Sequence, residues 1–169
     1  MPRKLGKNTT QRLALIKNQA SNLLWNGKIE TTVDRAKEVR SYAEKIITSA
    51  IKTYTDIIET ETVEMNEKGK EVKKTIVKDG AKKLAARRRI MTKLCDLKEV
   101  QGENESKSEF KNRTKDIKHP LIEKLFNEIA PKYATRAEQK GQGGGYTRII
   151  RLGERKGDNA EVCILQLVD

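Results

Sequence analysis

The sequence predicts an α+β protein in which about four helices pack on a small, mainly antiparallel three-stranded sheet, with an extra inserted β-hairpin. Three observations lead to this prediction. Apolar residues recur at helical spacing in four segments, short β-branched runs lie near both ends of the chain, and a length of 169 residues fits one domain. We therefore expect a single domain over residues 1–169.

The first two helices are predicted from their apolar stripes and from the residues that border them. The first is expected to begin at potential N-caps in residues 8–10 and to stop at Asn26-Gly27. The second is expected to start at about Val33, behind Thr32 as cap. Its stripe is the clearest in the chain and comprises Ala36, Val39, Ala43, Ile46, Ala50 and Ile51.

Two further helices are predicted in the second half of the chain. One begins at Asp79 or Gly80 and carries three consecutive arginines, Arg87 to Arg89, of which at least one must face solvent or phosphate. The other opens at His119-Pro120, because proline is favoured in a first helical turn, and is expected to run until Ala130-Pro131.

Three strands are predicted to form the sheet. Residues 28–32 are short and partly β-branched, and residues 146–152 follow a glycine run at 141–145. The final run, 162–168, is apolar on nearly both faces, a pattern that favours a central strand covered by helices.

Two segments are predicted to lie outside this core. Residues 61–65 and 72–78 indicate a protruding hairpin within 57–83, joined by a polar turn at 66–70. An isolated hairpin is marginally stable in water, so it should be mobile or held by a partner. Residues 98–118 are polar and predict a loop or a disordered insertion.

Positive charge is concentrated at the start of the chain. The net charge is +12, from 36 Lys and Arg against 24 Asp and Glu, and residues 1–28 carry six basic side chains and no acid. An acid-free basic segment suits phosphate neutralisation, because an acid would repel a polyanion. We favour nucleic acid as the partner of the arm, residues 1–9, over a solubilising tail or a membrane-surface helix.

Several functions are disfavoured by composition. The chain has no apolar run near the roughly 20 residues that cross a bilayer and no signal peptide, so a cytoplasmic protein is expected. Cys95 and Cys163 lack local partners and are expected to be buried thiols. The only histidine, His119, is expected at a helix cap or on the surface, and no catalytic group, metal site, cofactor or small-molecule substrate is predicted.

Short motifs in a fixed order then resemble a known family. The motifs near the start of the chain are Arg3-Lys4-Leu5-Gly6-Lys7 and then Gln11-Arg12. Those near its end are Gly144-Gly145-Tyr146-Thr147-Arg148-Ile149 and then Gly157-Asp158. Between them lie Ile29-Glu30-Thr31-Thr32, Arg35-Ala36-Lys37-Glu38-Val39-Arg40 and Lys124-Leu125-Phe126. Together these motifs resemble bacterial large-subunit ribosomal proteins of the L17 family. The resemblance implies helices on a three-stranded sheet and binding of ribosomal RNA near the nascent-chain exit, among neighbouring large-subunit proteins.

The resemblance and the outward basic positions of the first helix give the candidate RNA-binding residues, which are Arg3, Lys4, Lys7, Arg12, Lys17, Arg35, Arg40, Arg87, Arg88, Arg136, Tyr146 and Arg148. Residues 57–83 and 98–118 are expected to be insertions relative to shorter members of the family. Residues 138–143 lengthen the loop before Gly144, and the family's proline after Ala160 is absent.

Alternatives remain at this stage. The arginines at 87–89 could form a solvated helix face, the glycine run could be a linker, and Tyr146 could pack on the sheet instead of stacking on a base. A free-standing RNA chaperone or nucleic-acid-binding protein could use the same basic surface, and an RNA-processing enzyme is the least favoured reading.

Overall fold

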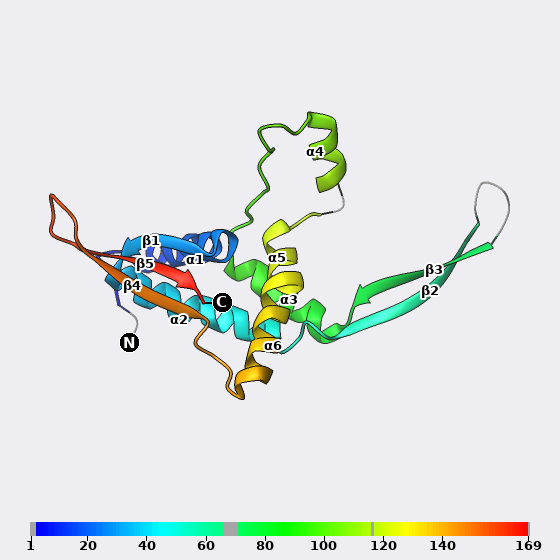
Figure 1. Cartoon of the computed structure of the whole chain (residues 1–169), viewed down its shortest axis with the longest axis horizontal. Helices are drawn as coiled ribbons and strands as arrows, with labels where there is room; N and C mark the ends of the chain where they lie inside the picture. The colour runs from blue at the N-terminus through cyan, green and yellow to red at the C-terminus, as the bar shows by residue number, and fades with distance from the viewer. Residues whose placement is uncertain (1–2, 66–70, 116, 169) are drawn as a thin grey trace.

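A computed structural model describes residues 3–65, 71–115 and 117–168. The predicted turn at 66–70 lies outside these residues. In chain order the elements are α1 (Thr9–Asn26), β1 (Lys28–Thr32), α2 (Val33–Ile51), β2 (Ile57–Met65), β3 (Glu71–Asp79), α3 (Ala81–Lys93), α4 (Lys107–Thr114), α5 (Pro120–Lys124), the π-helix η1 (Leu125–Ile129), α6 (Ala130–Lys140), β4 (Thr147–Glu154) and β5 (Glu161–Leu167). The predicted α+β class is confirmed (Figure 1).

Local capping sets the bounds of α1. The side chain of Asn8 accepts a hydrogen bond from the backbone N–H of Gln11, 2.8 Å away, which satisfies one free donor of the first turn. At the other end Gly27 has φ +76 and donates its N–H to the carbonyl of Leu23. A residue with a Cβ is strained in this left-handed conformation, so the predicted stop at 26–27 is confirmed with its physical cause.

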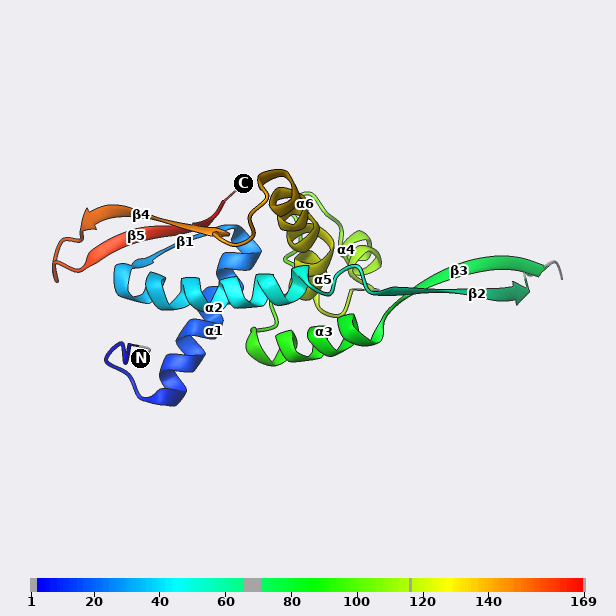
Figure 2. The same cartoon turned by 90° about the horizontal axis from the view of Figure 1, so that it is seen from below.

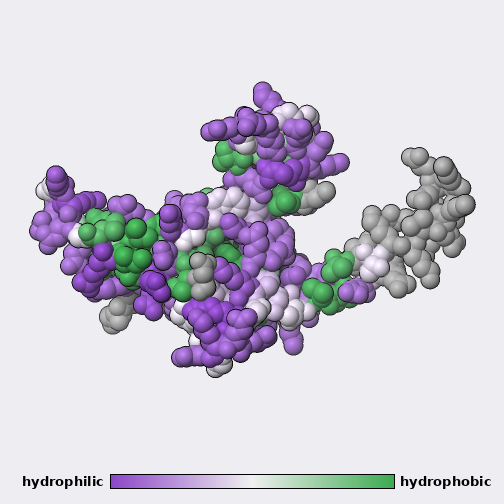
Figure 3. Space-filling model, in the orientation of Figure 1, coloured by the Kyte–Doolittle hydropathy of each residue, from purple (hydrophilic) through white to green (hydrophobic). Residues whose placement is uncertain are grey.

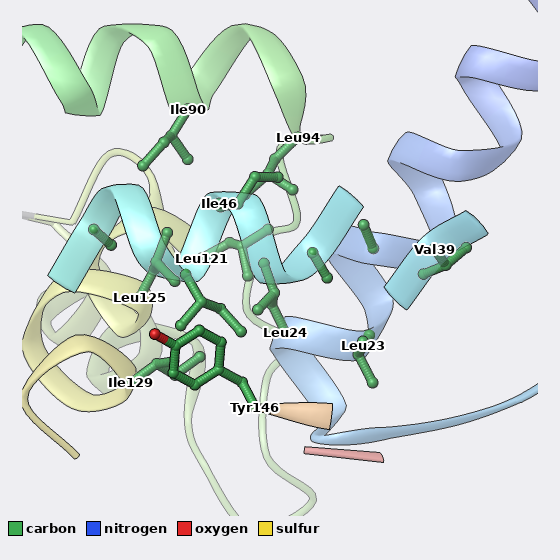
Figure 4. Packing of buried hydrophobic residues seen from close by; sticks show 14 of the residues in the cluster. Leu23, Leu24, Val39, Ile46, Ile90, Leu94, Leu121, Leu125, Ile129 and Tyr146 are labelled. Carbon is green, nitrogen blue, oxygen red and sulfur yellow. The ribbon is translucent and has the colours of Figure 1, made fainter. Parts of the chain in front are cut away.

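Helix α2 lies at the centre of the molecule. Figure 2 shows the sheet on one side of it and α3 with the first half of α1 on the other. Its predicted stripe is buried except for Ile51, which is partly buried, and Ala36, Val39, Ala43 and Ala50 are fully inaccessible to solvent. Three of these are alanines, so the neighbouring elements approach closely. Figure 4 shows Ile46 of α2 packed among side chains from α3, α5 and η1, including Ile90, Leu94, Leu121 and Leu125.

The three-stranded sheet has the order β1-β5-β4, with antiparallel pairing throughout, so the prediction that the last strand is central is confirmed. Cys163 and Leu165 of β5 are fully buried toward the helices. The opposite face carries Ile164 and Ile150, which are partly exposed, with 39% of Ile150 accessible. Helices therefore cover one face of β5, and its other face is only partly buried.

The fourth predicted helix extends beyond Pro131, through α5, η1 and α6 to Lys140. A proline inside a helix lacks an N–H and clashes with the preceding turn. Here the turn just before it is π-helical, and the N–H of Ala130 reaches the carbonyl of Leu125, five residues back. This wider turn accommodates the proline, so the predicted end at 130–131 is corrected to Gly141, where φ is +63.

The predicted hairpin is present as the ribbon β2–β3, which projects from the body (Figure 1). Its base is joined to the N-terminus of α3 through Asp56. The backbone carbonyl of Asp56 accepts the N–H of Gly80, and its carboxylate accepts the N–H groups of Lys82 and Lys83 at 2.8 and 3.2 Å. Asp56 therefore caps the N-terminus of α3 although the whole hairpin separates the two in the sequence, so the sequence pattern did not reveal this cap.

Residues 98–118 contain the helix α4, so the predicted loop is wrong over 107–114. A capping box explains the helix: Ser106 accepts the N–H of Glu109, whose carboxylate accepts the N–H of Ser106. Arg113 then pairs with Glu105 at 2.9 Å and also with Glu99, which ties the helix to the residues before it.

Both cysteines are free thiols. Cys163 is fully buried, and burial raises the pKa of its thiol above the usual value. Cys95 is only partly buried, so the expectation of two buried thiols holds fully for Cys163 alone.

The junction between the hairpin and α3 gives a stability prediction. An added Cβ at Gly80 would overlap the carboxylate of Asp56. We expect Gly80→Ala to displace this cap and lower the free energy of unfolding by about 1–2 kcal/mol. The matched control is Gly102→Ala, because a Cβ there meets only Glu105 at 3.6 Å and should be neutral or slightly stabilising. Urea unfolding of both variants tests this; equal midpoints would contradict the role of Asp56.

Candidate nucleic-acid interface

The arm is folded back against the start of α2. Leu5 and Gly6 have φ values of +54 and +65, which turn the chain, and the N–H of Lys7 donates to the carbonyl of Lys4 at 3.1 Å. The backbone N–H of Arg3 donates to Glu38 at 3.1 Å, and its guanidinium pairs with Asp34. The arm is thus held by two acids of α2, beside the first turn of α1 (Figure 2).

A groove of about 470 Å³ lies between α1 and α2, next to the arm. Arg12 and Leu13 line it from α1, and Tyr42 and Lys45 line it from α2; one carboxylate, Glu38, is also present. Leu13 is 45% exposed although it belongs to the apolar stripe predicted for the first helix. We use the term arm–groove surface for Lys4, Lys7, Arg12, Tyr42 and Lys45.

Tyr42 and Lys45 line this groove although neither residue is among the candidates predicted from the sequence. The hydroxyl of Tyr42 donates to the carbonyl of Lys93 at 2.8 Å, which joins α2 to the end of α3. Burial, and then the charge of Cys95, raise the pKa of Tyr42 above the usual value for tyrosine. The signal that could have found both residues is their spacing on α2, outside its buried stripe.

Arg87 is used inside the protein. Its Nε lies 2.8 Å from Oδ2 of Asp79, its guanidinium pairs with Glu123, and its Cζ lies 5.5 Å from the ring centroid of Phe126. Lys83 also pairs with Asp79, at 2.9 Å. Burial alone would lower the pKa of Arg87, but the hydrogen bond and charges of these carboxylates raise it. This cluster ties the hairpin and α3 to α5.

Lys17 and Arg136 are also engaged within the fold. Lys17 donates its ammonium to the carbonyl of Thr92 in the last turn of α3, at 2.8 Å, where a cation complements the helix dipole. Arg136 donates to the carbonyl of Gly145 at 3.3 and 3.4 Å and lies 5.7 Å over the ring of Tyr133. Lys17, Arg87 and Arg136 therefore have intramolecular partners that the sequence did not indicate.

Tyr146 belongs to the core. It is only 6% exposed, and its ring centroid lies 4.9 Å from that of Tyr133, at an angle of 56°. The hydroxyl of Tyr133 donates to the carbonyl of Tyr146, which fixes the start of β4. The structure thus corrects the candidate role of Tyr146, because a buried ring cannot stack on a base.

The remaining candidates reach the surface. Arg35 and Arg12 are half-buried, and Arg40 pairs with Glu44 at 3.4 Å. The exposed ones are Arg3, Lys4, Lys7, Arg40, Arg88 and Arg148. The arm and Arg12 come together at the arm–groove surface, whereas Arg148 lies on the sheet. In the β4–β5 turn, the hydrogen bonds from Arg155 lower the pKa of Asp158 to about 2, and the two exposed side chains pair with each other.

Figure 3 shows that hydrophilic side chains dominate this face of the molecule, with apolar ones gathered over the sheet and at the base of the hairpin. The latter groups comprise Ile150 and Leu152 of β4 and Ile57, Ile58 and Val77 of the hairpin. Within residues 3–65, 71–115 and 117–168, no group of three or more His, Cys, Asp or Glu could hold a metal ion. No helix in these ranges is long and apolar enough to cross a membrane.

The fold and this surface define a class: a small, strongly basic α+β protein with exposed cations on its arm, on α3 and on its sheet. Comparison with known proteins gives the family. The family model described as Ribosomal protein L17 matches residues 15–168. The chain belongs to this family, and the resemblance seen in the motifs is confirmed.

Curated relatives agree over nearly the full chain. They include the large ribosomal subunit proteins bL17 of Lachnospira eligens, 41% identical over 98% of both chains, and of Acetivibrio thermocellus, 39% identical over 98% of both. That of Clostridium tetani is 36% identical over 98% of this chain and 96% of its own. These relatives are ribosomal proteins, so the prediction that the chain is not an enzyme is confirmed. The prediction that 57–83 and 98–118 are insertions stays a prediction.

Substitutions of two neighbouring arginines of α3 should have different effects on the free energy of unfolding. Arg87→Met removes one partner each from Asp79 and Glu123, and we expect it to lower the free energy of unfolding by about 1.5–3 kcal/mol. Arg88→Met changes an exposed side chain and should leave stability within about 0.5 kcal/mol. Urea unfolding of both variants tests the assignment. A larger loss for Arg88→Met than for Arg87→Met would show that the cluster is not structural.

Proposed function

We propose that this chain is a structural constituent of the large ribosomal subunit, in the cytoplasm, and that it binds ribosomal RNA through its arm–groove surface near the nascent-chain exit. Family membership supports the place in the subunit, and the folded, acid-free arm beside the groove supports the RNA contact. The location near the exit rests on the resemblance of the motifs to the family. Its partners are ribosomal RNA and neighbouring large-subunit proteins.

The physical basis of the RNA contact is release of counterions. Each Lys or Arg that meets a phosphate frees condensed cations, so affinity falls steeply as salt rises. Arg12 can bridge phosphate oxygens with its planar fork and fix orientation, whereas Lys4, Lys7 and Lys45 act as point charges. Such contacts read the shape and backbone of the RNA.

The arm is ordered before it binds. The pair between Arg3 and Asp34 joins side chains that are 47% and 61% exposed, and an ion pair so accessible to water stabilises little. Arg3 can therefore exchange this carboxylate for a phosphate at small cost. The contact with Glu38 uses the backbone of Arg3, so the arm keeps its position while the guanidinium changes partner.

Protein neighbours would meet the apolar groups outside the core. Ile57, Ile58 and Val77 are 47%, 52% and 57% exposed at the base of the hairpin, and Leu152 is 56% exposed on β4. Branched side chains gathered in this way favour contact with another protein, because RNA offers them few apolar partners.

The test is sucrose-gradient sedimentation of the tagged chain from cell lysate at low and high salt. The test variant replaces Arg3, Lys4, Lys7 and Arg12 by alanine. The matched control removes the same charge from exposed positions of the 98–118 segment, namely Lys107, Lys111, Lys115 and Lys118. We expect the unaltered chain and the control to remain with the large subunit at high salt and the arm variant to be released.

The contribution of the arm is measured as the affinity of each protein for a ribosomal RNA fragment at several salt concentrations. Loss of four phosphate contacts should reduce the slope of log affinity against log salt by about 3. Complete release of the unaltered chain at high salt, together with equal affinity for unrelated RNA, would contradict the proposal and support a free-standing RNA chaperone. Equal behaviour of arm variant and control would place the contact outside the arm–groove surface.

A further inference from the structure

A second hollow lies away from the arm, where the end of α1 meets β1, the α5–α6 helix and the end of β5. Its volume is about 400 Å³, within the range of small-ligand sites. The side chains that define its chemistry are Trp25, Asn26, Lys28, Lys124, Lys132 and Gln166. None of these residues contributes to the arm–groove surface.

Trp25 is held in a defined position in the wall of this hollow. The ammonium of Lys124 donates to the backbone carbonyl of Trp25 at 2.8 Å and lies 5.4 Å from the centroid of its ring. The side chain is partly exposed, and a second hollow of about 530 Å³ also borders Trp25 and Lys124. A partly exposed aromatic ring with space beside it can serve as a stacking platform for a flat ligand.

The polar groups of the hollow match the parts of a nucleotide. The side-chain amides of Asn26 and Gln166 can donate to and accept from the edge of a base. Three ammonium groups line the hollow against one carboxylate, that of Glu128, so an anion is favoured. Since Lys124 is engaged by Trp25, the exposed Lys28 is the best placed of them to meet a phosphate.

The second hollow has the opposite charge character. It is bordered by Glu99, Glu123 and Glu128 with Lys124 as the only cation among its lining residues. A phosphate is disfavoured there by like-charge repulsion. The strand of a bound RNA is therefore expected on the side of Lys28.

We propose that the hollow at Trp25 binds one unpaired nucleotide of RNA, with its base stacked on Trp25 and its phosphate at Lys28. Unstacked bases held on aromatic rings are a common mode of sequence-dependent RNA recognition. This proposal rests on the proposed function in taking RNA as the partner. It adds a contact that reads a base, whereas the arm–groove surface reads the backbone.

Trp25 is the only tryptophan in the chain, so its fluorescence reports on the ring that borders this hollow. The probe is a single-stranded adenosine hexanucleotide, compared at equal phosphate concentration with a fully paired RNA duplex long enough to be stable. Both are titrated into the full chain and into the variant that lacks Arg3, Lys4, Lys7 and Arg12. We expect saturable quenching by the single strand in both proteins and none by the duplex.

Two variants test the residues, with fluorescence anisotropy of labelled RNA as the readout. Stacking of one base corresponds to a change in affinity of about 5- to 150-fold, so Trp25→Leu should weaken the single strand within that range and leave the duplex unchanged. Lys28→Gln alters an exposed side chain and should weaken the single strand several-fold while the fold is kept. Lys107→Gln is its matched control and should have no effect.

Three results would overturn the proposal: no quenching by the single strand, equal quenching by the duplex, or unchanged affinity of both Trp25→Leu and Lys28→Gln. Failure here is separable from failure of the proposed function. If the hollow binds no nucleotide, the unaltered chain still sediments with the large subunit; if the chain has no place in the subunit, sedimentation fails whatever the fluorescence shows.

Discussion

Burial of the apolar stripe of α2 is the constraint on which the structure depends. This helix contacts α1, α3, the π-helical turn, α6 and all three strands of the sheet, and its stripe is largely alanine and branched aliphatic residues. Small side chains allow several elements to approach one helix closely, which lets a chain with 36% hydrophobic residues build a core. The polar face of α2 then receives the arm, so the RNA-binding surface is positioned by the same helix that organises the core.

The cations of the chain perform two different tasks. Lys17, Lys124 and Arg136 each donate to a backbone carbonyl, and Lys83 and Arg87 neutralise Asp79 beside the ring of Phe126. These side chains replace apolar packing at the junctions between elements, where the small core does not reach. Only the cations outside these junctions are available to RNA, so the net charge overstates the number of side chains that can bind it.

Local patterns determined most of the fold, and long-range contacts determined most of the site. The strand at 28–32 was predicted with its observed bounds because Gly27 and Val33 border it in the sequence. The helix at 107–114 was missed although Ser106 and Glu109 carry its capping signal. By contrast, the internal role of Arg87 depends on Glu123, and the hollow at Trp25 combines segments from both ends of the chain. No periodicity reveals such neighbours, since they are created by the packing itself.

The place of β5 in the order of the strands has a consequence for folding during synthesis. Among the described residues, the central strand of the sheet is made after both of its neighbours, and β1 has no hydrogen-bonding partner until β5 arrives. Helices α1 and α2 can associate early because their contacts are local, but the sheet must close a loop that spans most of the protein. The sheet therefore cannot complete the core before β5 has been made, and until then the inner edge of β1 is exposed to other chains.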